Sequence, residues 1–445
     1  MAARPRSVEI RAYQVGFGDC LLLSFVYSKQ DKRHVLIDFG TTALPKRGRP
    51  AKAARPSEHM PAVARDIATA CGGRLTAVVA THRHADHISG FGTDGRTGKS
   101  GDIIAGLRPK VVLQPWTEDP DAAIDARHAT RESRRSPRSV VAGLSAMHGI
   151  ARSIHQLALR PPAWMGRTLQ RELAFIGLDN IANESAVKNL IAMGRAKGAT
   201  PVWAHHGSRS GLERHLPGVK VHVLGPPDLR QTEKIRKMRR TDPDEFWHLL
   251  AGAGALRLAE PLVHGVEGRA APGSRRVPPA ARWFRDKLER MRGDQLLQIV
   301  RTLDDQMNNT SLILLFEVFG KKLLFPGDAQ LENWSWALQE APDAAATAKL
   351  LSGVDVYKVG HHGSLNATPK KLLWEKFEKR SKPAGRRLHS LLSTLPGKHG
   401  KTASRTEVPR RTLLDALQQE TYLQSTDDLR FGAAPELCQK LELKP

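Results

Sequence analysis

The chain has 445 residues, 40% hydrophobic and 26% charged, and this ordinary globular composition excludes wholesale disorder. Its formal net charge of +24 favours an anionic partner, whereas an aromatic content of 5% argues against a surface of base-stacking rings. Three scattered cysteines, no secretory signal and no apolar run near the roughly 20 residues that span a bilayer lead us to expect a cytoplasmic protein without a transmembrane segment.

The N-terminal part has the pattern of β-structure. Alternating and apolar runs predict strands at 7–14, 21–27 and 34–39, the last two joined as a hairpin through a polar turn. A basic loop at 41–60, a helix at 60–70 and a buried strand at 75–80 follow, with a further strand at 110–114.

The middle of the chain changes character. Residues 119–197 and 228–300 are basic and mostly helical in pattern, and strands are expected between them at 202–205 and 219–224. Beyond 300 we expect a hairpin at 310–318 and 321–325, strands at 354–359 and 388–394, and helices at 331–338 and 410–419. We therefore divide the chain into two halves of one α/β core, 1–118 and 301–445, around an insertion at 119–300 whose strand pair at 198–227 belongs to the core.

The strongest chemical signal is a cluster of potential metal ligands directly after the strand at 75–80. His82, His84, Asp86 and His87 lie within six residues. A tight loop allows His82 and His84 to reach one metal ion while Asp86 and His87 turn towards a second. Histidine and carboxylate ligands suit Zn²⁺, or Mn²⁺ and Fe²⁺ in a site richer in oxygen.

Other polar residues stand at predicted strand ends beside glycine, where they can join this cluster. Asp38 ends the strand at 34–39, Asp328 follows the strand at 321–325, and His361 and His362 follow the strand at 354–359. Singly such residues are usually turn or cap residues. Together with the histidine cluster they predict a metal site along one sheet edge.

These motifs resemble the metallo-β-lactamase superfamily, and most closely the hydrolase domain attached to bacterial DNA-uptake competence channels and its soluble relatives. The resemblance rests on several motifs in the expected order: Val15-Gly16-Phe17-Gly18-Asp19, Leu36-Ile37-Asp38-Phe39-Gly40, Thr81 to His87 with Ser89-Gly90, Asn308-Asn309-Thr310-Ser311-Leu312, Gly327-Asp328-Ala329 and Lys358-Val359-Gly360-His361-His362-Gly363-Ser364. The helical stretches 119–197 and 228–300 are outside it.

The resemblance implies an αββα sandwich with large, mainly helical basic insertions and one or two zinc ions at one edge, manganese or iron being alternatives. His82 and His84 would bind the first ion, and Asp86, His87 and one of His361 and His362 the second. Asp328 would bridge the two. Asp38, together with Asp19, would lie behind the ligands and orient an imidazole.

The chain also departs from the family pattern. Many members supply another histidine between the cluster and the bridging aspartate, and none is clear here. Asn308 or Asn309 would take that region as a weak ligand or substrate contact, with Ser364 as a further candidate. A G-H-P near the C-terminus is replaced by Glu407-Val408-Pro409. His205-His206-Gly207-Ser208 copies the later H-H-G-S, but we interpret it as a loop.

Three functions follow as expectations. The first is a phosphodiesterase or nuclease that uses hydroxide formed on a metal at neutral pH to attack nucleic acid, a nucleotide or another anionic phosphate, with Asp86 or Asp328 orienting the water. The second is a metallohydrolase of a small phosphoester, ester or lactone, capped by the insertions. The third is a weakly catalytic metal-binding scaffold that docks unidentified protein partners through its basic insertions.

Overall fold

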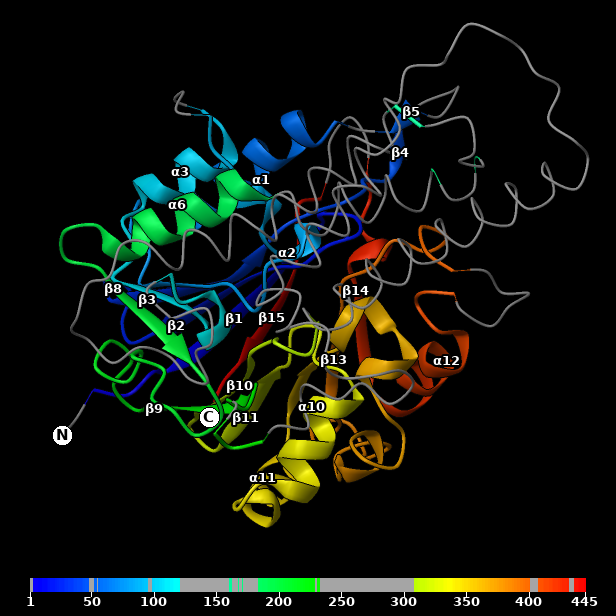
Figure 1. Ribbon diagram of the computed structural model, residues 1–445. Coiled ribbons are helices and arrows are strands. Elements are labelled where there is room, and N and C mark those ends of the chain that lie inside the picture. The colour runs from blue at the N-terminus through cyan, green and yellow to red at the C-terminus, as the bar shows by residue number, and fades with distance from the viewer. Residues whose placement is uncertain are drawn as a thin grey trace, which may run out of the picture.

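The computed structural model describes residues 3–47, 52–53, 55–94, 98–120, 160–161, 167, 170, 183–228, 230–232, 308–400, 407–431 and 436–445. These residues form a mixed α/β structure with two mixed sheets, as the sequence pattern predicts at the level of fold class (Figure 1). None of the helices among them is long and apolar enough to cross a membrane.

The first sheet has seven strands among the described residues, in the order β15-β1-β2-β3-β6-β7-β8. Their bounds are β1 Ser7–Tyr13, β2 Cys20–Val26, β3 Lys32–Phe39, β6 Ala77–Val79, β7 Val111–Pro115, β8 Thr200–Ala204 and β15 Cys438–Leu443. β15, β1, β2 and β3 pair antiparallel, and β3, β6, β7 and β8 run parallel. The carboxyl ends of the parallel strands therefore meet at one edge.

The second sheet has six described strands in the order β14-β13-β12-β11-β10-β9. Their bounds are β9 Val219–Gly225, β10 Ile313–Val318, β11 Lys321–Phe325, β12 Val356–Lys358, β13 His389–Leu392 and β14 Tyr422–Ser425. β9, β10 and β11 pair antiparallel, and β11 to β14 run parallel. A separate ribbon joins β4 Lys46–Arg47 to β5 Lys52–Ala53.

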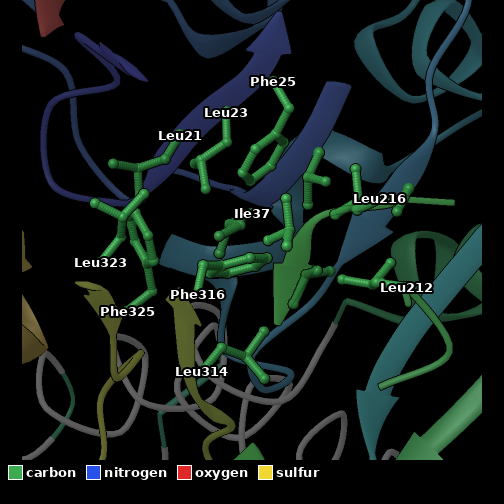
Figure 2. Close-up of a cluster of buried hydrophobic side chains, with 14 of the residues drawn as sticks. Leu21, Leu23, Phe25, Ile37, Leu212, Leu216, Leu314, Phe316, Leu323 and Phe325 are labelled. Carbon is green, nitrogen blue, oxygen red and sulfur yellow. The ribbon is translucent and has the colours of Figure 1, made fainter. Parts of the chain in front are cut away.

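The two sheets pack face to face around the largest apolar cluster. Figure 2 shows Leu23, Phe25 and Ile37 of the first sheet directed towards Phe316 and Phe325 of the second. Alternate residues of each strand point to this cluster because side chains in a strand alternate between faces. Burial of apolar surface between the sheets thus fixes how their edges meet.

Helices cover the outer faces of both sheets. α1 Pro56–Ala70, α3 Ser100–Gly106 and α6 Glu184–Arg195 pack on the first sheet through a second apolar cluster (Figure 1). α10 Leu331–Ser335, α11 Ala344–Ser352 and α12 Arg411–Glu420 pack on the second sheet through a third. The one-turn helix α2 Ala85–Ile88 lies after β6, and the five-residue π-helical turn Trp336–Glu340 continues α10.

The structure departs from the sequence predictions at several elements. The expected strands at 202–205 and 219–224 form as β8 and β9, but they do not pair with each other: each is the edge of a different sheet. The helix expected from residue 60 begins at Pro56, which suits the first turn because proline lacks an amide hydrogen. The sequence patterns gave no expectation for α11, β14 or β15. Most of the predicted helical stretches 119–197 and 228–300 lies outside the described residues; α6 is the helix described there.

Candidate metal centre

The histidine cluster forms a buried loop between the two sheets. It leaves the carboxyl end of β6, and the backbone stays extended at His84 before the single turn of α2 begins. That change of conformation directs successive side chains to different sides. His82, His84, Asp86 and His87 are all at most 7% exposed.

Asp38 fixes this loop from the end of β3. Its Oδ1 accepts a hydrogen bond from the Thr81 amide at 2.7 Å, and its Oδ2 accepts one from Thr81 Oγ1 at 2.7 Å. The same Oδ2 accepts the Nδ1 proton of His87 at 2.8 Å. Asp38 adopts a left-handed φ of 55°, which is uncommon for a residue with a side chain. This contact orients the imidazole of His87 and leaves its Nε2 to face the cluster.

Asp328 lies opposite His87, in the turn after β11. Its Oδ1 is 3.1 Å from His87 Nε2, and its Oδ2 is 3.6 Å from His361 Nε2. The carboxylate is buried, and neither oxygen accepts a well-aligned hydrogen bond from the described residues. Asp328 thus presents both oxygens to the imidazoles around it.

The tight turn after β12 separates the roles of His361 and His362. Both have a left-handed backbone, with φ of 44° and 52°, so their rings leave the turn in different directions. His362 is fully buried; its Nδ1 donates to the Ser393 carbonyl at 3.0 Å and its Nε2 is 3.0 Å from Asp86 Oδ2. The His361 side chain is 26% exposed at the rim.

His82 and His84 form a second group beside these residues. His82 Nε2 and His84 Nδ1 are 3.0 Å apart, and the ring centroids of His82 and His87 are 4.2 Å apart. These two imidazoles therefore lie next to the His87 ring, which contacts Asp38 through Nδ1 and Asp328 through Nε2.

Four donor atoms come together where a cation would fit. Asp86, His87, Asp328 and His362 each offer one ligand atom, and these atoms all lie within 4.8 Å of one another. This set of two imidazoles and two carboxylates suits zinc, and also manganese or iron. It contains three of the ligands expected for the second ion and the expected bridge, with His362 rather than His361.

The protonation pattern of these imidazoles supports that fit. Nδ1 of His87 is bonded to Asp38 and Nδ1 of His362 to the Ser393 carbonyl, so in the neutral form of each ring Nε2 would face a carboxylate with its lone pair. Two acceptors that face each other in a buried site need a second proton or a metal ion between them. Oδ1 of Asp86 is also buried and accepts no hydrogen bond from the described residues.

The pKa shifts of His87 and Asp328 also indicate that the cluster favours a bound positive charge. Burial acts to lower the pKa of His87, but Asp328, Asp38 and Asp86 outweigh it and raise that pKa well above its usual value. Burial acts to raise the pKa of Asp328, but His87 and His361 lower it well below its usual value. Protons on the imidazoles thus supply the charge that a divalent ion would supply.

The imidazoles of His82 and His84 are in the opposite state. Burial, with neighbouring His87 and His84, holds the pKa of His82 well below its usual value. Burial also lowers the pKa of His84 to about 4. Both rings are therefore neutral near pH 7, which is the form that binds metals.

Behind the four-residue cluster lies a second group of titratable side chains, in which the ammonium of Lys358 supplies a positive charge. Asp19, Asp38 and His87 also have donor atoms within 4.8 Å of one another. Here the Nδ1 of His87 is bonded to Asp38, and Asp19 forms an ion pair with the buried ammonium of Lys358. This group supports the neighbouring imidazoles rather than offering a further metal site.

The remaining residues predicted for the site have less defined places. Asn308 and Asn309 are buried, in the segment whose Leu312 amide donates to the Thr81 carbonyl, at the base of the histidine loop. The side-chain oxygens of both asparagines lack hydrogen-bond partners in the described structure. Ser364 follows the His361–His362 turn and is half-buried. Among the described residues these three side chains form no hydrogen bond or ion pair with the four-residue cluster, so their roles stay predictions.

His205-His206-Gly207-Ser208, which repeats the later H-H-G-S motif, makes contacts that hold the local fold. His206 Nδ1 donates to the Leu224 carbonyl at 2.9 Å, and Nε2 lies 2.7 Å from Asp343 Oδ1. Its amide donates to the Pro226 carbonyl. These bonds tie the loop after β8 to the end of β9.

Sequence reasoning assigned no role to Lys358 or to His399. Lys358 belongs to the last motif of the resemblance, and because it follows Val356 by two residues on the same strand face, its side chain points between the sheets. His399 forms a backbone bridge with Val408, and its ring centroid lies 4.2 Å from that of Phe17, which in turn lies 4.3 Å from that of His362. A histidine thus lies near the candidate site, although Glu407-Val408-Pro409 stands in place of the G-H-P expected from the resemblance.

Comparison of the chain with models of known protein families and with curated proteins found no match in either case.

Proposed function

We propose that this protein is a metal-dependent hydrolase of the metallo-β-lactamase superfamily that cleaves phosphodiesters in nucleic acid or nucleotides. The observation that carries the proposal is the convergence of Asp86, His87, Asp328 and His362 within 4.8 Å in a buried site. Buried acceptors that face one another without a cation are costly, so such a cluster points to a function.

The arrangement of the two sheets supports the superfamily part of the proposal. Two mixed sheets packed face to face with helices outside are what an αββα sandwich requires. The cluster draws on the ends of strands in both sheets, as the resemblance implies. We also propose that the protein belongs to the branch of the superfamily that includes the hydrolase domain of DNA-uptake competence channels.

The residues that would hold metal follow from their contacts. Asp86, His87 and His362 would hold one ion, His82 and His84 a second, and Asp328 would lie between them. A divalent ion in this place supplies Lewis-acid polarisation of a phosphoryl oxygen and lowers the pKa of water towards ~7. Asp38 keeps the Nδ1 proton of His87 in place, and the Ser393 carbonyl does the same for His362.

The buried carboxylates would orient the attacking water. Oδ1 of Asp86 is buried and accepts no hydrogen bond from the described residues, so it would accept one from the water that attacks phosphorus, with Asp328 as the alternative. The attack forms a new P–O bond and breaks the bond between phosphorus and the leaving oxygen, and the proton that the water loses passes to that leaving oxygen. His361, at the exposed rim, is placed to meet the substrate as it enters.

The charge of the chain supports an anionic substrate. A formal net charge of +24 attracts phosphate backbones over distances of about a Debye length, roughly 8–10 Å in physiological salt. Binding to nucleic acid is therefore expected to weaken steeply as salt rises. A flat salt dependence would remove this support.

The decisive experiment measures metal content and hydrolysis of bis-p-nitrophenyl phosphate on the same samples. Wild type is compared with His84→Ala and with His205→Ala, which removes a histidine outside the cluster. We expect one or two zinc or manganese ions per chain in wild type and in His205→Ala. We expect His84→Ala to lose metal and diester cleavage together.

The opposite results discriminate the alternatives. Cleavage of a chromogenic carboxyl ester without cleavage of the diester or of nucleic acid would favour a small-molecule hydrolase. A protein that takes up no metal after loading and cleaves nothing would contradict the proposal and favour a scaffold. Active protein is then tested on single- and double-stranded DNA and on RNA.

A further inference from the structure

An open cavity beside the first sheet is lined by positively charged side chains that have no role in the proposed reaction. The cavity has a volume of about 780 Å³. Its lining includes one carboxylate, that of Asp31. Six cationic side chains line it as well: Lys29, Lys32, Arg33, Arg74, Lys110 and Arg214. We call this cavity the basic basin.

Four separate segments build the basic basin. They are the turn between β2 and β3 with the start of β3, the turn after α1, the residue before β7, and the loop between β8 and β9. The basin therefore lies at the amino ends of parallel strands whose carboxyl ends lead to the metal centre. β3 begins at Lys32 beside the basin and reaches Asp38 one residue before its end, and six steps of about 3.3 Å separate the two residues by about 20 Å. The basin is a separate site.

The charge in the basin is largely uncompensated. Arg33 Nη2 is 3.1 Å from Asp31 Oδ2, and its Nη1 donates to the His215 carbonyl at 2.7 Å. The other five cations form no ion pair in the part of the chain that the structure describes, and each is exposed at the rim. Burial lowers the pKa of His215, and the positive charges of Lys110, Arg214 and Arg33 lower it further.

We propose that the basic basin binds a small anion that carries several linked phosphate groups, such as inorganic tripolyphosphate or the triphosphate of a nucleotide. The volume is that of a small-ligand site, which is usually about 300–1,000 Å³. The cations surround one concavity, which matches clustered phosphates better than an extended backbone. Arginine adds bidentate hydrogen bonds to phosphate oxygens. This inference does not depend on the proposed hydrolase function.

The test is calorimetric titration of sodium tripolyphosphate into the full chain, with EDTA present so that metal at the other site cannot recruit phosphate. The basin variant is Arg74→Ala/Lys110→Ala/Arg214→Ala. Its matched control is Lys370→Ala/Lys371→Ala/Lys382→Ala, which removes the same charge from exposed lysines elsewhere. We expect one saturable site per chain, weakened at least about tenfold in the basin variant and less than about twofold in the control.

Two further ligands distinguish the source of the phosphates. Binding of ATP as tight as that of tripolyphosphate, with much weaker binding of AMP, supports recognition of the linked phosphates. The proposal is overturned if tripolyphosphate binding is not saturable, if the two variants weaken it equally, or if only a long oligonucleotide binds. Diester hydrolysis by the basin variant, measured separately with metal, keeps failure here distinct from failure of the proposed function.

Discussion

Lys358 and Asp19 form a buried ion pair between the two sheets, directly behind the imidazoles of the candidate metal centre. Asp19 comes from the turn directly before β2 and Lys358 from the end of β12. Asp19 Oδ1 is 3.7 Å from His362 Nδ1, and Oδ2 is 3.7 Å from His87 Nδ1. The pair thus supports both imidazoles that face the carboxylates.

Replacing Lys358 with Met is expected to destabilise the protein by about 3–5 kcal/mol, because it leaves the Asp19 charge buried without its partner. Denaturant unfolding in EDTA measures this loss. The double variant Asp19→Asn/Lys358→Met removes both charges and should recover a large part of it. Equal instability of the single and double variants would contradict a specific pair.

Asp38→Asn should lower metal affinity by about 10–100-fold while the chain still folds, since it disturbs the contact that orients His87. Asparagine tolerates the left-handed backbone of this position, so the backbone itself is preserved. Competition with a chromogenic chelator gives the affinity. Asp355→Asn, at a buried aspartate that pairs with Lys379, is the control and should bind metal like wild type.

Gly40→Ala should lower metal affinity by about tenfold or more without altering a single donor. A Cβ at Gly40 would lie 2.4 Å from the His87 amide nitrogen and 2.5 Å from the Ala85 carbonyl oxygen, so the backbone of α2 would have to move. Gly106→Ala is the matched control, since its Cβ would have no atom within 4 Å. Unchanged affinity in Gly40→Ala would show that the loop position is not critical.

The metal-free protein should lose stability as pH falls from about 6.5 towards 4. Burial lowers the pKa of His84 to about 4, whereas in the unfolded chain it is near ~6.5, so over this range the unfolded chain binds a proton that the folded chain does not. The folded state then loses about 2 kcal/mol between pH 7 and pH 4.5 through this residue alone.

Unfolding of EDTA-treated wild type and His84→Asn at the two pH values measures this effect. The variant should show a smaller difference by about the same amount, since it removes the titrating group. Equal pH dependence in both proteins would contradict the burial argument. The raised pKa of His87 acts in the opposite direction: burial opposes the rise, the carboxylates cause it, and the stability that it supplies below ~6.5 is lost as pH rises through the folded value.

Strong local patterns made much of the core predictable. The hairpin of β2 and β3 and the hairpin of β10 and β11 form close to their expected bounds, because apolar runs bounded by turn residues identify strands well. The sequence also grouped Asp38, Asp86, His87 and Asp328, since each lies at or shortly after a strand end. Such positions at parallel strand ends meet in space.

The missed features depend on contacts that no local pattern encodes. β15 is a short, partly exposed strand whose partner β1 is at the other end of the chain. The choice of His362 over His361 depends on left-handed backbone at both residues. The burial of Lys358 makes sense only with Asp19 across the sheets, so its partner had to be seen in three dimensions.

The bond between Asp86 and His362 joins residues 276 positions apart, one after a strand of each sheet. An ion held by both would act as a crosslink between the sheets, and its binding energy would add to the folding energy. The ion could then leave only when the two sheets separate locally. The rate of metal loss to an excess of chelator would therefore report the rate at which the core opens.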